Sequence, residues 1–245
     1  MLPFDRQEKI LQILNESGHV SIHRLAQLIH VSEPTMRRDL TQMEKQGLVR
    51  RTYGGAVLPD AIREMPVVLR KEDNASAKRR IAADAVKLLR KGAVIFIDSA
   101  STVQNMIHLL SENQDITVVT NSISACQKLI ELRIKTYCVG GLVDAGDEAM
   151  RGKYAEDFIR SIQIDQAFFS CSALSDDGQL GGHHESAVSF LQTLLKHSAQ
   201  RIFLCTYNKL GRTCMHNLCT LRDIDAIICD QPLPEHLMKM VGKNR

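Results

Sequence analysis

Apolar side chains recur at helical spacing in three stretches near the start of the chain. Residues 6–17 carry them three and four positions apart, and Gly18 follows the last one, as a residue just past a helix often does. Ser21 can cap a second helix, and Ser32 can cap a third one that has Pro34 in its first turn. The apolar face of the second helix comprises Ile22, Leu25, Leu28 and Ile29.

The period changes after the third helix. Residues 48–53 alternate apolar and polar side chains, which predicts a strand, and Gly54 with Gly55 predicts a turn into a second strand. Three helices and a β-hairpin are the elements of a winged helix-turn-helix, which we therefore expect over residues 1–58. Residues 59–76 contain two prolines, mixed charge and no clean period, so they predict a linker with one short strand at 67–69.

Short apolar runs alternate with helical patterns through the rest of the chain. The runs cover residues 93–97, 116–119, 135–139, 164–169, 201–204 and 226–229, and helical patterns cover 81–89 and 103–110. Apolar strands separated by helices indicate a mostly parallel sheet covered on both faces. We therefore predict an α/β fold class, in which residues 77–245 form a Rossmann-like domain that binds a ligand outside the carboxyl ends of its strands.

The third helix separates an apolar face from a cationic one. At about 100° per residue, Leu40 and Met43 fall within about 40° of Met36, and all three are expected to face the core. Arg38 and Lys45 fall on the opposite side, beside Thr35, Thr41 and Gln42. Arginine binds guanine edges and phosphates, so this face suits the major groove of DNA, although a solvated basic face is the alternative.

Charge is unevenly distributed along the chain. The formal net charge of +3 is too small to indicate a nucleic-acid partner, but residues 37–51 contain five basic side chains and two acidic ones, Asp39 and Glu44. A basic hairpin directly after the third helix could lie against the DNA backbone. The residues expected to contact DNA are Ser32, Thr35, Arg37, Arg38, Thr41, Lys45, Arg50, Arg51, Tyr53, Gly54 and Gly55.

Seven cysteines are present, an odd number without a C-x-x-C pair, so we expect buried small apolar side chains and no disulfide framework. Cys214, His216 and Cys219 match no zinc spacing, and we expect neither a metal nor a cofactor. The stretch 181–186 predicts a loop that leads into a helix. Because no apolar run reaches about 18 residues and no secretory signal opens the chain, we expect a cytoplasmic protein.

The first 58 residues resemble the DNA-binding domain of the DeoR family of bacterial sugar-metabolism regulators. The resemblance rests on R-Q-E-K-I-L from Arg6, L-A-Q-L-I-H-V-S from Leu25, T-M-R-R-D-L from Thr35 and G-L-V-R-R-T-Y-G-G-A from Gly47. It implies that the third helix is the recognition helix and that Asp39 is a fixed part of it. We expect Asp39 to hold a wing arginine or a neighbouring backbone group.

The resemblance continues to about Asp230 and implies a domain similar to sugar-phosphate isomerases that senses an effector. The implied protein is a sequence-specific regulator, expected to repress a carbohydrate operon, with double-stranded operator DNA and a phosphorylated sugar as partners. A homodimer or higher homo-oligomer would match a repeated operator. The residues expected to bind the effector are Lys78, Asp98, Ser99, Ala100, Ser101, Thr102, Asn121, Ser122, Ser170, Ser172 and Lys209.

Two alternatives stay open at these positions. Hydroxyls at a helix start can hold a phosphate, but Ser101 or Thr102 could instead be an ordinary helix cap. Ala100, the stretch 168–173 and Thr206 depart from the glycines and the acid that are usual in the family, so sensing could be altered or lost. An isomerase would need a carboxylate base, for which the spacing of Asp176, Asp177 and Glu185 favours none, and we expect no enzyme.

Overall fold

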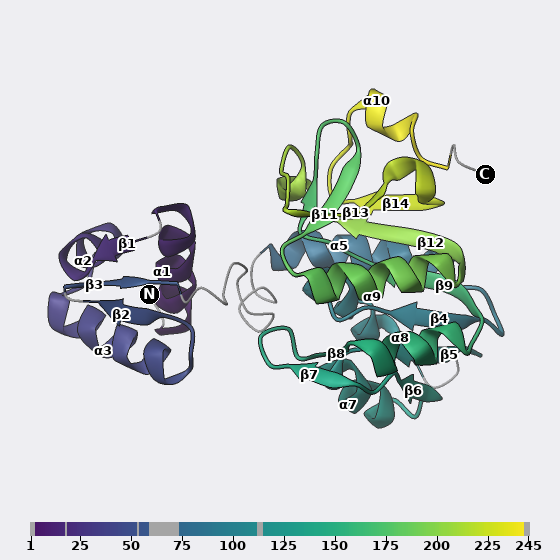
Figure 1. Cartoon of the computed structure of the whole chain (residues 1–245), viewed down its shortest axis with the longest axis horizontal. Helices are drawn as coiled ribbons and strands as arrows, with labels where there is room; N and C mark the ends of the chain where they lie inside the picture. The colour runs from purple at the N-terminus through teal and green to yellow at the C-terminus, as the bar shows by residue number, and fades with distance from the viewer. Residues whose placement is uncertain (1–2, 18, 53, 59–73, 112–114, 243–245) are drawn as a thin grey trace. The chain divides into compact units, whose positions relative to one another are not determined.

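The computed structural model describes residues 3–17, 19–52, 54–58, 74–111 and 115–242. The chain divides into two compact units, Met1–Arg70 and Lys71–Arg245, which are described separately below (Figure 1). The strand expected at 67–69 and the candidate residue Tyr53 lie outside the described residues.

The first unit, called the head below, has three helices and a small antiparallel sheet among its described residues. Its elements are α1 (Pro3–Ser17), β1 (His19–Ser21), α2 (Ile22–Ile29), α3 (Glu33–Lys45), β2 (Arg50–Thr52) and β3 (Gly55–Val57). The strand order is β1-β3-β2, so the predicted hairpin gains a third strand. The sequence did not indicate β1, because three residues are too few to show an alternating period.

The turn between α2 and α3 follows from local chemistry. The side chain of Ser21 accepts a hydrogen bond from the N–H of Arg24, and that of Ser32 accepts one from the N–H of Thr35, which confirms both predicted caps. His30 ends α2 in the left-handed conformation at φ 57°. Its N–H reaches back to the last turn of α2, so the chain changes direction within a few residues.

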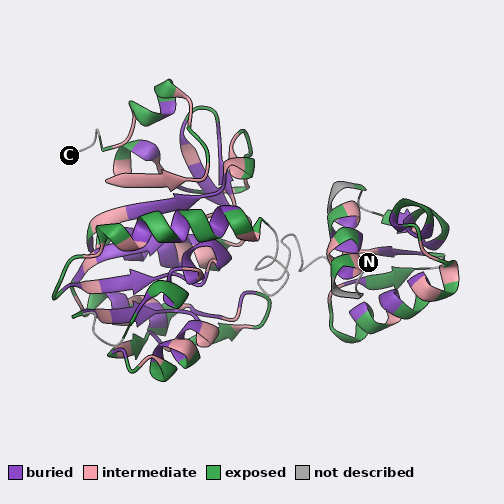
Figure 2. Cartoon of the chain, turned by 180° about the vertical axis from the view of Figure 1, so that it is seen from behind, coloured by how far each residue is buried: buried purple, intermediate pink, exposed green. Residues whose placement is uncertain are grey.

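The second unit, called the sensor unit below, is built on a six-stranded sheet in which every pair of neighbours is parallel, in the order β14-β12-β9-β4-β5-β6. The strands of this sheet are β4 (Val94–Ile97), β5 (Thr117–Thr120), β6 (Thr136–Cys138), β9 (Ile164–Phe169), β12 (Ser198–Cys205) and β14 (Ala226–Cys229). The parallel α/β fold predicted from the apolar runs is therefore confirmed. Figure 2 shows the buried positions along these strands.

Helices cover both faces of this sheet. The helical elements are α5 (Ala75–Ala85), η1 (Val86–Leu88), α6 (Ser101–Gln104), η2 (Ile107–Leu109), α7 (Ile123–Glu131), α8 (Lys153–Arg160), α9 (Glu185–Lys196), η3 (Tyr207–Lys209), η4 (Leu221–Asp223) and α10 (Glu235–Met238). Ile81 of α5 and Leu129 of α7 pack on one face with Phe168. Ile159 of α8 and Leu194 of α9 pack on the other face with Phe169, the next residue of β9.

Two predicted elements differ in the structure. The helix expected over 103–110 is two short pieces, because the side chain of Asn105 donates a 2.8 Å hydrogen bond to the carbonyl of Ser101 and competes with the helical ladder. Gly181 and Gly182 belong to a strand rather than to a loop. That strand is β11 (Gln179–Gly182), and it lies in a small sheet with β10 (Ala173–Leu174) and β13 (His216–Thr220). A separate two-stranded sheet is formed by β7 (Leu142–Asp144) and β8 (Ala149–Arg151).

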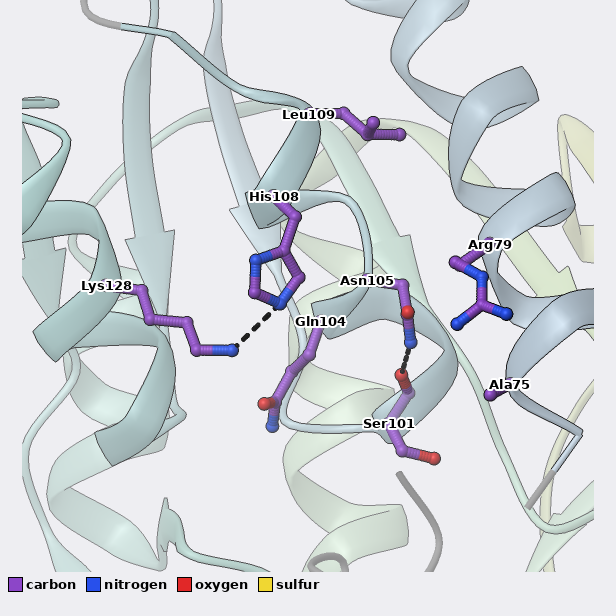
Figure 3. A pocket seen from close by; sticks show the side chains of 8 residues that line it. All are labelled: Ala75, Arg79, Ser101, Gln104, Asn105, His108, Leu109 and Lys128. Atoms are coloured by element: carbon purple, nitrogen blue, oxygen red, sulfur yellow. Dashed lines mark hydrogen bonds between the residues drawn. The ribbon is translucent and has the colours of Figure 1, made fainter. Parts of the chain in front are cut away.

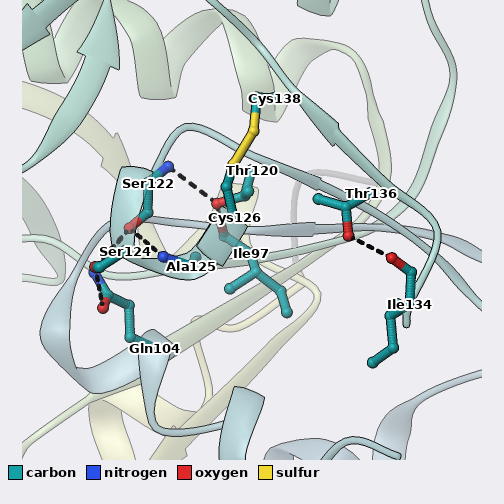
Figure 4. Close-up of a disulfide and its surroundings, with 10 residues drawn as sticks. All are labelled: Ile97, Gln104, Thr120, Ser122, Ser124, Ala125, Cys126, Ile134, Thr136 and Cys138. Atoms are coloured by element: carbon teal, nitrogen blue, oxygen red, sulfur yellow. Dashed lines mark hydrogen bonds between the residues drawn. A yellow bond between two sulfur atoms is a disulfide. The ribbon is translucent and has the colours of Figure 1, made fainter. Parts of the chain in front are cut away.

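The expectation about cysteines is wrong for one pair. Cys126 of α7 and Cys138 of β6 form a disulfide (Figure 4). Helix α7 turns directly into β6, and this return brings together two thiols that are separated by 12 residues. Cys205 is buried as expected, whereas Cys171, Cys214, Cys219 and Cys229 are only partly buried.

Candidate DNA-binding face and effector site

Helix α3 places its two faces as the sequence predicted. Met36, Leu40 and Met43 are 0% exposed and lie in the core of the head. Arg38 and Lys45 are exposed on the other side. The helical period therefore leaves two cations in solvent on a helix that is anchored by apolar contacts.

These cations differ in their partners. Among the described residues of the head, Arg38, Lys45 and Arg50 form no ion pair, so their charges are available to an anionic partner. Arg37 instead lies 3.5 Å from the carboxylate of Glu33 on the same helix. The pKa of Glu33 lies below its usual value, first because His23 hydrogen-bonds it and then because Arg37 is near.

Asp39 has a different partner from the one we expected. It is 5% exposed, and its carboxylate accepts hydrogen bonds from Arg6 of α1, with 2.8 Å to Nε and 3.1 Å to a terminal nitrogen. The expectation that it holds a wing arginine is therefore wrong. The helical wheel placed Asp39 on a flank of α3, but it could not show that α1 supplies a cation there.

The wing is joined to α3 through Arg51 of β2. Its guanidinium donates a 2.8 Å hydrogen bond to the hydroxyl of Thr41, and its backbone N–H donates one of 2.8 Å to the carboxylate of Glu44. The hydroxyl of Thr41 in turn donates to the carbonyl of Arg37. These bonds fix the strand that carries Arg50 and Arg51 against the exposed side of α3.

Four other residues expected to contact DNA have clear structural roles. The hydroxyls of Ser32 and Thr35 lie 2.9 Å apart at the start of α3. Gly54 is exposed with φ +84°, which a side chain rarely adopts. Gly55 is buried against β1, where a Cβ atom would lie 2.6 Å from the carbonyl oxygen of Val20. Glycine at 55 is therefore needed for packing of the sheet.

In the sensor unit, the predicted effector residues follow neighbouring strands of the parallel sheet. Asp98 and Ser99 follow β4, Asn121 and Ser122 follow β5, and Ser170 follows β9. Strands β9, β4 and β5 are adjacent, so these residues meet at one edge of the sheet, where ligands of open α/β sheets bind.

Hydrogen bonds hold the first two loops together. The backbone N–H of Ser99 donates a 2.9 Å bond to the side-chain oxygen of Asn121. Gln104, which the sequence reasoning missed, donates bonds of 2.6 Å to the carbonyl of Ser99 and 3.1 Å to the hydroxyl of Ser122. All four residues are buried, so this network is a rigid support.

Asp98 is the buried carboxyl of this site. Burial raises its pKa above the usual value, while Arg151 and the backbone N–H groups of Ser99, Ser170 and Ala100 act in the opposite direction. Arg151 is 7% exposed and also pairs with Asp144 at 2.8 Å and with Asp147. The sequence did not indicate a role for Arg151, because its partners Asp144 and Asp147 are brought to it by the β7–β8 hairpin, which no pattern in the sequence predicted.

Lys209 reaches the strand-end residues through Ser170. Its ammonium donates a 2.8 Å hydrogen bond to the hydroxyl of Ser170, which donates to the carbonyl of Leu204 at 2.6 Å. Lys78 is 4% exposed on α5, a rare position for a lysine. The N–H of Ser172 donates to the carbonyl of Gly181 in β11.

The loop after β4 settles one alternative left open by the sequence. Helix α6 begins at Ser101 with Ala100 at its N-cap position and no side-chain cap, so Ser101 and Thr102 do not cap it. Both are buried within the helix. The hydroxyl of Thr206, where an acid is usual in the family, donates to the side-chain oxygen of Asn208 at 2.7 Å.

No described helix is long and apolar enough to cross a membrane. Within the described ranges, no group of three or more His, Cys, Asp or Glu side chains is arranged to hold a metal ion.

Comparison with known proteins matches nearly the whole chain. The family model described as the DeoR-like helix-turn-helix domain matches residues 6–61, and the one described as the DeoR C terminal sensor domain matches residues 73–231. The first match covers the head, and the second covers all six strands of the parallel sheet.

Relatives match over the same length. The L-fucose operon activator of Haemophilus influenzae is 34% identical over 237 residues, which are 96% of this chain and 94% of the relative. The glycerol-3-phosphate regulon repressor of Escherichia coli is 27% identical over 237 residues, again 96% and 94%. Ribose 5-phosphate isomerase A of Methanocaldococcus jannaschii aligns with a TM-score of 0.43 and 17% identity, over 56% of this chain and 55% of that chain. The two sequence relatives are regulators of transcription and not enzymes.

Proposed function

The chain belongs to the DeoR family of transcriptional regulators, with a DNA-binding helix-turn-helix domain and a sensor domain, and we propose that it represses a carbohydrate operon under the control of a phosphorylated sugar. Its head binds DNA and its sensor unit senses an effector. The expectation that the chain is a regulator and not an enzyme is confirmed by its relatives.

The observation that carries the DNA-binding part is the set of exposed cations on and beside α3. Arg38 and Lys45 project from a helix whose opposite face is fully buried, and Arg50 follows on a strand tied to that helix. Arg38 is assigned to base edges in the major groove, and Arg37 and the wing arginines to phosphates. Thr35, Thr41 and Ser32 support this face through their hydroxyls.

The effector is assigned to the carboxyl ends of β4, β5, β9 and β12. Lys209 and Arg151 bring positive charge to hydroxyls and amides there, a combination that suits a sugar bearing a phosphate. The name of one relative refers to a phosphorylated polyol, glycerol 3-phosphate, which supports this class of ligand, and the name of another refers to the sugar L-fucose. The assigned residues are Lys78, Asp98, Ser99, Ala100, Ser101, Thr102, Asn121, Ser122, Ser170, Ser172 and Lys209.

The assembly proposed for this function is a cytoplasmic homodimer or higher homo-oligomer that presents two heads to a repeated operator. The proposed domains are residues 1–58 and 77–245, with residues 59–76 as the connection that transmits the signal, although α5 begins at Ala75 within that stretch. Effector binding would change operator affinity through a coupling free energy between the two sites.

Two linked measurements test this function. Genomic fragments bound by the protein are selected and sequenced, and the strongest one is titrated with and without ligands in a fluorescence anisotropy assay. Glycerol 3-phosphate, glucose 6-phosphate and ribose 5-phosphate are screened by thermal shift, since a ligand of the folded state raises the Tm. We expect one of them to raise the Tm and to change operator affinity. A sugar phosphate that binds but leaves operator affinity unchanged contradicts the proposal.

Matched variants assign the effector to the strand ends. Lys209→Met removes the charge that lies beside Ser170 and is expected to abolish the thermal shift. Arg222→Met, which removes an exposed charge elsewhere in the sensor unit, is expected to keep it. Equal shifts in both variants would overturn the assignment of Lys209.

A further inference from the structure

A pocket opens in the sensor unit beside the strand-end residues, between α5, α6, η2 and α7 (Figure 3). Its volume is about 400 Å³, within the range of small-molecule sites. Arg79 lies on one wall, and Lys128 with His108 lies on the opposite wall. Its described lining residues include the cationic side chains Arg79 and Lys128 and no carboxylate.

The side chains between the two walls are polar. Gln104 and Asn105 contribute amides and Ser101 contributes a hydroxyl. Leu109, which is exposed, is the one large apolar side chain among the described lining residues. Such a lining suits a charged, hydroxyl-bearing ligand better than an apolar one.

The two cationic walls differ in how their charges are held. The ammonium of Lys128 donates a 3.0 Å hydrogen bond to Nε2 of neutral His108. Among the described residues, the guanidinium of Arg79 has no carboxylate within ion-pair distance, whereas the neighbouring Arg80 lies 4.0 Å from Asp230. An anion between the walls would give Arg79 an ion-pair partner and would also contact Lys128.

We propose that this pocket binds the phosphate group of a small hydroxylated metabolite, at a second site next to the strand-end effector site. Arg79 and Lys128 neutralise the phosphate, and the amide of Asn105 and the hydroxyl of Ser101 serve its polar remainder. Only Ser101 belongs to both sites. The proposal goes beyond the effector site and does not depend on it.

Gln104 connects the two sites, because it lines the pocket and also bonds the strand-end loops. Its amide already bonds Ser99 and Ser122 at the strand ends, and its oxygen accepts a 3.1 Å bond from Ser124. The side chain is therefore fixed from three directions. A ligand that displaces it by a few tenths of an ångström must also move the loop after β4.

His108 offers a direct readout of occupancy. Burial and the nearby Lys128 hold its pKa below the usual value, and a phosphate in the pocket would oppose both effects and raise it. Inorganic phosphate is titrated into the full-length protein while the ring signals of histidine are followed by NMR, with His108→Gln assigning the signal. We expect a saturable change at His108 and a higher pKa, and no change with chloride at the same ionic strength.

Variants decide whether the response comes from the pocket. Arg79→Met and Lys128→Met are each expected to weaken phosphate binding roughly tenfold or more, because each removes a charged hydrogen-bond donor. Arg80→Met is the matched control on the same helix and is expected to change binding by less than about twofold. Circular dichroism checks that the variants are folded. No response at His108, or equal affinity in all three variants, would overturn the proposal.

The strand-end variant separates this site from the effector site. We expect Lys209→Met to keep the phosphate response at His108 even if it loses the thermal shift with sugar phosphates. Loss of the His108 response in Lys209→Met would mean that there is one site and not two. If the natural sequence shows the phosphate response at His108 but no sugar phosphate raises its Tm, the second site is supported and the proposed effector of the strand-end site is wrong.

Discussion

Arg6 of α1 and Asp39 of α3 form an ion pair through two hydrogen bonds of 2.8 and 3.1 Å. Their side chains are only 13% and 7% exposed. Apolar contacts resist separation of two helices but tolerate sliding, whereas a two-point ion pair also fixes their relative position. The pair therefore sets the orientation in which α3 presents Arg38 and Lys45.

Asp39→Ala should destabilise the head. The variant leaves the largely buried Arg6 guanidinium without the Asp39 carboxylate, and it loses the hydrogen bond that raises the pKa of Arg6. We expect a clear fall in the Tm of the first unit by differential scanning calorimetry. Glu33→Ala removes an exposed partner of Arg37 and should lower the Tm much less. A similar fall in both variants would show that the buried pair has no special role.

Arg51→Met should weaken DNA binding in two ways. It removes one cation and releases the wing strand from the hydroxyl of Thr41. The slope of log affinity against log salt should become smaller by about one, as expected for the loss of one phosphate contact. Thr41→Val keeps the cation and breaks only the 2.8 Å bond, so its affinity should fall while its salt slope stays the same. An unchanged slope in Arg51→Met would place Arg51 away from phosphates.

The disulfide between Cys126 and Cys138 should stabilise purified protein that is kept without reductant. It closes a loop with a sequence separation of 12, and bonds of this kind contribute about 2–3 kcal/mol to the free energy of unfolding. Reductant should therefore lower the Tm of the natural sequence but not that of a variant with serine at both positions. A thiol assay on denatured protein should find five reactive thiols, and seven would disprove the bond.

Cys229 should be alkylated before Cys171 and Cys205. A hydrogen bond from Cys205 lowers the pKa of Cys229, whereas burial raises the pKa of Cys171 to about 12, and the same Cys229 contact and burial raise that of Cys205. A lower pKa gives more thiolate at a given pH, and the thiolate is the reactive form. When the pH is raised stepwise, labelling of Cys229 should therefore start at a lower pH than labelling of Cys171 or Cys205. Peptide mass spectrometry after brief iodoacetamide treatment measures the order. Cys205→Ala should slow Cys229, and equal rates for Cys171 and Cys229 would refute the assignment.

Features that depend on neighbouring residues in the sequence, namely helix faces, helix caps and buried strands, could be predicted from the sequence. The period of Met36, Leu40 and Met43 determines which face of α3 is buried, and Ser21 and Ser32 cap the helices that follow them. The apolar runs predicted all six strands of the parallel sheet. The central strands β4, β5 and β9 are mostly buried, and strands covered on both faces need continuous apolar side chains.

Contacts between distant segments could not be predicted. Arg6 and Asp39 are 33 residues apart, and nothing near either one indicates the other. Arg151 approaches Asp98 only because the β7–β8 hairpin returns to the sheet, and Cys126 meets Cys138 only because α7 turns into β6. The pocket is likewise lined by Arg79 of α5 and Lys128 of α7, and the strands β4 and β5 lie between these two helices in the sequence.

Whether the exposed face of α3 reads DNA is tested by the operator affinity of Arg38→Ala, measured by fluorescence anisotropy at physiological salt on the strongest selected genomic fragment. We expect a loss of about 10- to 100-fold relative to the natural sequence, because an arginine that binds a base edge contributes about 1–3 kcal/mol. Arg222→Ala, which removes one exposed arginine from the sensor unit, should bind as the natural sequence does. A folded Arg38→Ala variant with unchanged affinity would contradict the claim that the exposed face of α3 reads DNA.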